Sequence, residues 1–145
     1  MWYAAVLSLL ILGGGGTDIG QLHPVEVVQL YEKGGLLFLE TDTGDKGWGL
    51  STDEALKKLK ETTPGIIYLD TADYLLVERG LDREIASLDK HLKKNTRVCY
   101  APESIELQEV VLYLRVHRPE STLKNMEAPL EMLTYEGGRM IMKKF

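Results

Sequence analysis

The stretch from Ile66 to Asp70 reads Ile-Ile-Tyr-Leu-Asp, a continuous apolar run of strand length. An apolar run without polar alternation is typical of a strand that is covered on both faces of a sheet. We therefore predict a central, buried strand at residues 66–70. A second apolar cluster follows at residues 74–77, but its pattern does not distinguish helix from strand.

Helical patterns lie on both sides of this predicted strand. Upstream, Ser51 and Glu54 have the spacing of a capping box, which predicts a helix that begins at Ser51 and ends at Pro64-Gly65. Downstream, apolar residues recur with helical spacing at positions 81, 85, 88 and 92. A strand at residues 97–100 and a third helix over residues 107–114 complete a central β-α-β-α unit.

Each end of the folded region carries a predicted β-hairpin. Residues 25–31 and 36–41 flank Gly34-Gly35, and residues 130–135 and 139–142 flank Gly137-Gly138. Paired glycines favour hairpins because the two-residue turn needs positive φ at its centre. Residues 42–49, between the first hairpin and the first helix, are expected to form a glycine-rich polar loop. The predicted fold is α/β (α+β): a mixed sheet with about three helices, a central β-α-β-α unit and terminal hairpins.

The first 17 residues contain no charged side chain, and residues 1–12 are the most apolar stretch of the chain. A helix of that length spans only about 18 Å, whereas a bilayer-spanning helix needs about 20 residues. Three interpretations remain open: a membrane anchor or uncleaved export signal, a cleaved signal, or a buried part of the domain. The four glycines at residues 13–16 favour a membrane segment, whereas the absence of a basic flank argues against it. We expect residues 18–145 to form one globular domain.

The net charge is -5, which disfavours general nucleic-acid binding, because that function needs a basic face. The single cysteine, Cys99, excludes an intramolecular disulfide and a cysteine-based zinc site. Cys99 lies in an apolar strand pattern and is therefore interpreted as a core residue.

The densest polar group in the sequence is a set of acidic residues near predicted strand ends. Glu40 ends a predicted strand, Asp42 and Asp45 lie in the glycine-rich loop with Trp48, and Asp70 and Asp73 follow the predicted central strand. If these strands are neighbours, the carboxylates would meet at one end of the sheet, where ligands bind in open α/β folds. The candidate ligand or partner site consists of Asp42, Asp45, Trp48, Asp70 and Asp73. Their spacing matches no EF-hand loop, so we expect neither a metal nor a cofactor.

Several segments together resemble a group of small, N-terminally anchored, uncharacterised proteins of spore-forming Firmicutes. They are Pro24-Val25-Glu26-Val27-Val28, Glu40-Thr41-Asp42-Thr43-Gly44-Asp45, Glu54-Ala55-Leu56 and the run from Tyr68 to Val77. The resemblance covers most of the chain and implies a membrane-associated bacterial protein. It implies no activity and no site residues.

The sequence contains no complete catalytic, metal or nucleotide signature. We therefore expect a non-enzymatic binding or assembly domain that is membrane-associated or exported, with a protein partner. A cytoplasmic location is the alternative address. The alternative function is a small hydrolase or divalent-metal-dependent enzyme that uses Asp42, Asp45, Asp70 and Asp73, and it depends on whether these carboxylates converge in a cleft.

Overall fold

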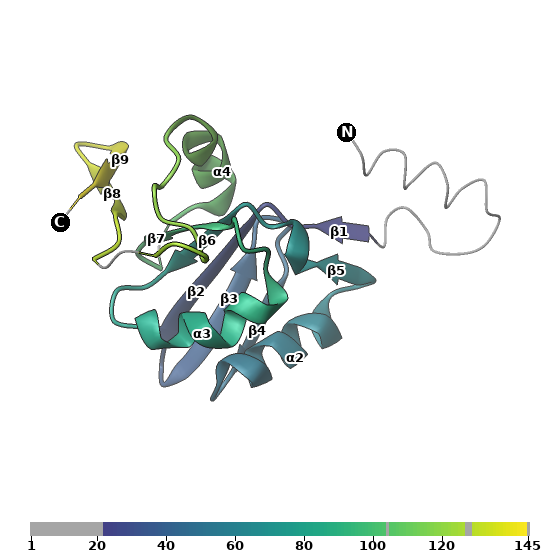
Figure 1. The fold of residues 1–145 in the computed structure, drawn as a ribbon. Coiled ribbons are helices and arrows are strands. Elements are labelled where there is room, and N and C mark those ends of the chain that lie inside the picture. Colours follow the sequence, from purple (N-terminus) through teal and green to yellow (C-terminus); the bar gives the residue numbers. More distant parts are fainter. Residues whose placement is uncertain (1–21, 104, 127–128, 145) are drawn as a thin grey trace, which may run out of the picture.

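The computed structural model describes residues 22–103, 105–126 and 129–144, which form a mixed sheet with helices on both faces (Figure 1). The seven-stranded sheet has the order β4-β3-β2-β6-β7-β8-β9. Strands β2, β6, β7 and β8 are parallel to one another, and the terminal hairpins add β3, β4 and β9 in antiparallel orientation. The predicted fold class is confirmed. The strand bounds are β2 Val27–Lys33, β3 Leu36–Thr41, β4 Lys46–Gly49, β6 Tyr74–Val77, β7 Arg97–Tyr100, β8 Met132–Glu136 and β9 Arg139–Lys143.

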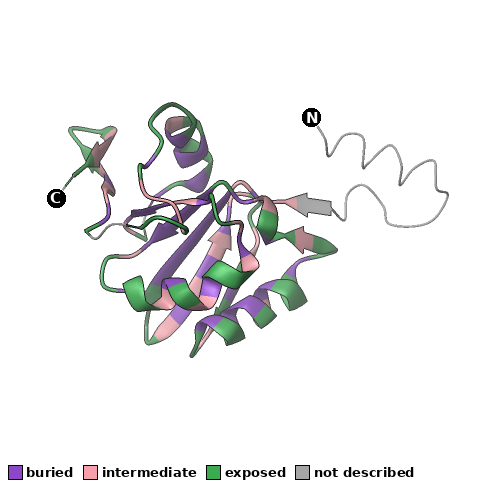
Figure 2. Ribbon diagram, viewed as in Figure 1, coloured by how far each residue is buried: buried purple, intermediate pink, exposed green. Residues whose placement is uncertain are grey.

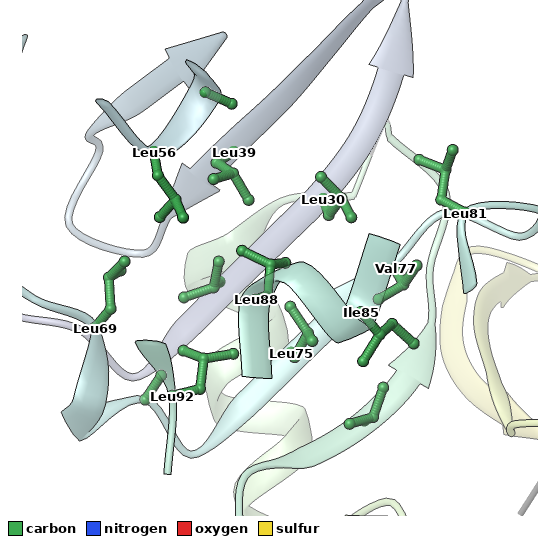
Figure 3. Close-up of a cluster of buried hydrophobic side chains, with 14 of the residues drawn as sticks. Leu30, Leu39, Leu56, Leu69, Leu75, Val77, Leu81, Ile85, Leu88 and Leu92 are labelled. Atoms are coloured by element: carbon green, nitrogen blue, oxygen red, sulfur yellow. The ribbon is translucent and has the colours of Figure 1, made fainter. Parts of the chain in front are cut away.

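Two buried clusters lie on opposite faces of this sheet. Helix α2 (Thr52–Thr62) and helix α3 (Ile85–Leu88) cover the main core, which includes Leu30, Leu39, Leu59, Leu75 and Leu88. Figure 3 shows Leu88 pointing toward Leu30 and Leu75 of the sheet. Helix α4 (Leu107–Val116) covers the second cluster, the α4-side core, which includes Val27, Leu76, Cys99, Val110, Leu114 and Leu133. The middle strands are therefore buried on both faces (Figure 2).

The prediction of a central strand at residues 66–70 is wrong in its position. Residues Ile66–Tyr68 form β5, which pairs in parallel with β1 (Leu22–Pro24) in a separate two-stranded sheet, and they are not buried. The apolar run is then interrupted by a short 3-10 turn, η2 (Leu69–Thr71), which directs Leu69 into the core. The central position belongs to β6, which lies between β2 and β7 and is buried throughout.

The apolar stripe at positions 81, 85, 88 and 92 is buried as predicted, but its backbone is less regular than one long helix. A 3-10 turn, η3 (Asp82–Glu84), precedes the short α3, and another, η4 (Asp89–His91), follows it. At the end of the stripe, Leu92 N donates to Asp89 O at 3.3 Å, a tighter spacing than that of an α-helix. The stripe therefore identified the buried face and not the helix type.

Residues 42–49 are only in part the polar loop that the sequence predicts. The turn closes at once, because Thr41 N donates to Asp45 O at 3.0 Å, and β4 then pairs with β3. Gly47 and Gly49 are required by packing: an added Cβ would lie 2.2 Å from Ala55 O and 2.4 Å from Glu54 Cβ, respectively. These glycines therefore allow helix α2 to lie directly on the backbone of β4.

The predicted hairpin turns and the Ser51 cap are confirmed. Both hairpin turns have positive φ at their two glycines, 60° and 82° at Gly34 and Gly35 and 56° and 77° at Gly137 and Gly138. Ser51 Oγ accepts from Glu54 N at 3.2 Å, as a capping residue should, although the Glu54 carboxylate accepts from Leu50 N instead of Ser51 N. The predictions for residues 1–17 lie outside the described residues. Within the described part of the chain, no helix has the length and apolar character needed to cross a bilayer.

Candidate functional site

An acidic cleft lies where the turn after β3 meets the start of α4. Its volume is about 190 Å³, which is below the roughly 300 Å³ at which small-molecule pockets begin. The cleft contains Asp42 and Asp45 of the predicted site. Its lining residues are Glu40, Thr41, Asp42, Gly44, Asp45, Ile105, Glu106, Leu107 and Gln108.

Asp42 has a structural partner in the backbone of β2. Its Oδ1 accepts from Glu26 N and from Val27 N, each at 2.9 Å, and Asp42 N donates to Val27 O at 3.2 Å. One carboxylate oxygen therefore satisfies the two backbone donors at the point where the chain enters the sheet. Its role is similar to that of an aspartate that caps a helix.

The remaining acids of the cleft also have partners within the chain. Asp45 Oδ2 accepts from Thr43 Oγ1 at 2.6 Å, and Glu40 forms an ion pair with Lys46 at 2.8 Å. Glu106 caps helix α4 by accepting from Gln108 N at 3.3 Å. These interactions account for the acidic residues as parts of the fold.

Asp70 and Asp73 are not among the residues that line this cleft. Asp70 lies exposed in η2, and Asp73 forms an ion pair with Lys93. Asp73 does approach the start of β2, since Asp73 N donates to Glu26 O at 2.9 Å. The predicted four-carboxylate cluster is nevertheless not assembled: across the described residues, no three His, Cys, Asp or Glu side chains are placed to hold a metal ion.

Trp48, the fifth residue of the predicted site, lies on a different surface. Phe38 and Trp48 are directly opposite each other in β3 and β4, as are Glu40 and Lys46. We call these four residues the β3–β4 outer face. Their side chains leave the strands on the side away from the buried face of α2, because their neighbours Gly47 and Gly49 lie against that helix. At the sheet edge, the Trp48 ring still reaches the exposed side of α2, where Lys58 lies beside it.

No described helix covers the β3–β4 outer face. Among the described residues, the buried strand residues of the α4-side core come from β2, β6, β7 and β8, with residues of β9 packed against them, and none comes from β3 or β4. Phe38 and Glu40 are consequently half-buried, and Trp48 is 37% exposed. Leu50, which follows directly after β4, is 77% exposed. Exposed apolar side chains that are adjacent on one surface are typical of an interaction site.

Aromatic and charged contacts order this face. The rings of Tyr31 and Phe38 stack with centroids 5.2 Å apart and planes 6° apart. Lys46 Nζ lies 5.8 Å from the centroid of the Phe38 ring, and Lys58 Nζ lies 5.1 Å from that of Trp48. The hydrogen bond to Glu40 raises the pKa of Lys46, and burial, followed by the charge of Glu40, raises the pKa of Tyr31. Both groups therefore keep their ordinary charge states at neutral pH.

Phe38, Lys46 and Leu50 were not among the residues that the sequence singled out. The signal that would have found them is the alternation of β4, in which Lys46 and Trp48 point away from two glycines that a helix contacts. Because residues 42–49 were predicted to be a loop, the alternation of β4 was not recognised. The surface therefore became recognisable only once β4 was placed beside β3.

Cys99 is buried in the α4-side core, as the sequence indicates. Burial raises the pKa of its thiol far above the usual range, so the thiolate needed for nucleophilic chemistry is not populated at neutral pH.

Comparisons of this chain with protein-family models, with curated proteins and with solved structures found no match.

Proposed function

We propose that this chain is a non-enzymatic binding or assembly domain that is held at a bacterial membrane and binds a protein partner through the β3–β4 outer face. The observation that carries the proposal is the position of Trp48 and the adjoining Leu50, which are solvent-exposed on a face beyond the reach of α4. Buried aromatic anchors supply much of the energy of protein interfaces, and tryptophan is enriched among them.

The hollow beside Trp48 has a volume of about 340 Å³, but it is an open depression lined otherwise by charged residues of α2, which suits a protein surface better than a small molecule. The acidic cleft is small, and its carboxylates are engaged in the fold. The β3–β4 outer face instead offers an apolar centre with an ion pair between Lys46 and Glu40 beside it. An apolar centre with a polar rim is the usual arrangement at protein–protein interfaces.

The membrane address rests on the uncharged segment at residues 1–17. Its 17 residues are close to the lower limit for a bilayer-spanning helix. The aromatic residues Trp2 and Tyr3 near its start suit the interface between lipid and water. This segment would hold the domain beside a membrane-bound partner and thereby raise the local concentration of each for the other.

The second candidate, a divalent-metal-dependent hydrolase, keeps one supporting observation. Asp42 and Asp45 line the same cleft, together with Glu40 and Glu106. However, Asp42 already accepts two backbone hydrogen bonds, and Asp70 and Asp73 lie outside the cleft. This candidate is therefore the weaker of the two.

Site-specific photo-crosslinking in the native host tests the first candidate. A photoreactive amino acid replaces Trp48 in the full chain, and a matched chain carries it at Leu112, an apolar position on α4 that is 65% exposed. We expect a discrete protein adduct from position 48, weakened by Leu50→Glu, and none from position 112. Equal adducts from both positions, or none from position 48, would contradict the proposal.

Once the partner is purified, its affinity for the full chain can be measured directly. Truncation of a central interface tryptophan weakens binding by about 2 kcal/mol or more, which is about 25-fold in Kd. We expect Trp48→Ala to have an effect of this size and Leu112→Ala to leave Kd unchanged.

A further inference from the structure

We propose that the small β1–β5 sheet rests on the lipid surface and orients the domain on the membrane, with Ile66 and Tyr68 in contact with the headgroup region. This inference rests on the membrane address in the proposed function. It concerns a different surface from the β3–β4 outer face and assigns that surface a lipid partner.

The length of the connecting chain keeps this sheet close to the membrane. The uncharged segment ends at Thr17, and β1 begins at Leu22. Five residue steps span at most about 17 Å even when the chain is fully extended. If residues 1–17 are inserted in the bilayer, the start of β1 must therefore lie within that distance of its surface.

The pairing of β1 with β5 places two exposed apolar side chains of β5 beside the strand that follows the uncharged segment. Leu22 is in register with Ile66, and Pro24 is in register with Tyr68, so the two strands lie about 4.8 Å apart. Ile66 is 47% exposed and Tyr68 is 37% exposed. Figure 1 shows β1 and β5 side by side and apart from the β8–β9 hairpin.

Alternation along β5 directs these two side chains to the same side. Ile66 and Tyr68 are two residues apart and point the same way, whereas Ile67 between them packs against the main core. The outward side of β5 therefore presents one aliphatic and one amphipathic aromatic residue. Tyrosine favours the interface between lipid and water because its ring is apolar and its hydroxyl can remain hydrated.

The β1–β5 sheet is fixed to the rest of the domain, so contact with lipid would set the orientation of the whole domain. Val25 N donates to Tyr68 O at 3.4 Å and to Thr71 Oγ1 at 3.0 Å. Thr71 Oγ1 also lies 2.8 Å from Val25 O. Val25 itself is buried in the main core and leads directly into β2.

Fluorescence from an environment-sensitive label on the full chain tests this inference. Tyr68→Cys and the control Leu112→Cys are each labelled with a nitrobenzoxadiazole dye, and unsubstituted chain reports any reaction at the buried Cys99. Each protein is mixed with vesicles of phosphatidylcholine and phosphatidylglycerol, and co-sedimentation is measured in the same samples. We expect the protein to co-sediment, with brighter, blue-shifted emission at position 68 and unchanged emission at position 112.

Each other outcome overturns a defined part of the inference. Co-sedimentation without a spectral change at position 68 would refute the lipid contact of β5 and leave the membrane address intact. Failure to co-sediment would refute the membrane address itself. A blue shift at position 68 before vesicles are added would show that the N-terminal segment or a second copy of the chain covers β5, which would also refute the lipid contact.

Discussion

Replacing Gly47 with alanine tests the close packing of α2 on β4, which fixes the β3–β4 outer face. An added Cβ would lie 2.2 Å from Ala55 O, 2.5 Å from Leu59 N and 2.7 Å from Leu59 Cα. All three are backbone atoms of one helix, so no side-chain rotation can relieve the contact. Restoring ordinary van der Waals distances requires α2 or β4 to move by about 1 Å.

This displacement would loosen the packing of Leu56 and Leu59, which lie on the buried face of α2. A gap of 0.5–1 Å forfeits about a quarter to a half of the attraction between the atoms that it separates. Overpacking usually destabilises a protein by about 1–3 kcal/mol, and contacts with rigid backbone lie at the upper end of that range. We therefore expect Gly47→Ala to lower the free energy of unfolding by about 3 kcal/mol.

Urea denaturation of the full chain, followed by circular dichroism, measures this change. Gly44→Ala is the matched control, because Gly44 has a φ of 89° and a Cβ added there would meet no atom within 4 Å. Its substitution should destabilise the protein only by the conformational strain of positive φ, about 1–2 kcal/mol. If Gly47→Ala unfolds within about 0.5 kcal/mol of the unsubstituted chain, α2 does not lie on β4 and the reasoning fails.

Four further predictions concern the core, the acidic turn, divalent cations and the membrane location. Leu88→Ala should lower the unfolding free energy by about 2–5 kcal/mol, because Leu88 is buried in the main core; an unchanged denaturation midpoint would mean that the helix is misplaced. Asp42→Ala should destabilise by about 1–3 kcal/mol, since it leaves two backbone donors without their acceptor, whereas Asp42→Asn retains an oxygen there and should remain close to the unsubstituted chain. Adding Mg²⁺ or Ca²⁺ should leave the Tm unchanged; a rise of several degrees that Asp42→Asn abolishes would favour the metal-dependent enzyme instead. In cell fractionation, the full chain should sediment with membranes and a chain that begins at Asp18 should not. Finding the full chain in the soluble cytosol would contradict the proposal that residues 1–17 are a membrane anchor.

The features that the sequence predicted correctly are those that local chemistry determines. The paired glycines at both hairpin turns adopt positive φ, and Ser51 caps its helix, because each effect involves residues a few positions apart. The stripe that contains Leu88 was correct for a similar reason, since helical spacing identifies a buried face. It could not distinguish α-helix from 3-10 turn, because both place these residues toward the sheet.

Whether a strand lies at the centre or the edge of the sheet depends on partners that are distant in the sequence. Residues 66–70 and 74–77 are both short apolar runs, and composition does not rank them. Val27 pairs with Tyr74, and Tyr74 pairs with Arg97, which places β6 at the centre. The run at residues 66–70 has only β1 as its partner in the described sheets. Such pairings join segments that are far apart in the sequence, so no local pattern contains them.

The acidic residues show a similar limit. The sequence placed Asp42 and Asp45 near a strand end correctly, and both line the cleft. It could not show that the Asp42 carboxylate accepts hydrogen bonds from Glu26 and Val27, which reach it across the sheet. A carboxylate engaged in this way has the same sequence signature as one that is free to bind a ligand.

The parallel pairing of β2 with β6 also constrains the order in which the chain folds. Hairpin β2–β3 is local and can form within about 1–10 μs. The β2–β6 pairing forms later, because Val27 pairs with Tyr74, which is about fifty positions away in the sequence. Sheets dominated by such distant pairings fold in milliseconds to seconds. During synthesis, the hairpin would leave the ribosome well before its parallel neighbour and would expose an apolar edge at Val28 and Leu30 for that interval. Refolding in a stopped-flow instrument should therefore resolve only the slower closure of the core, because the hairpin forms within the mixing time. The interval before closure is when the chain is most exposed to aggregation.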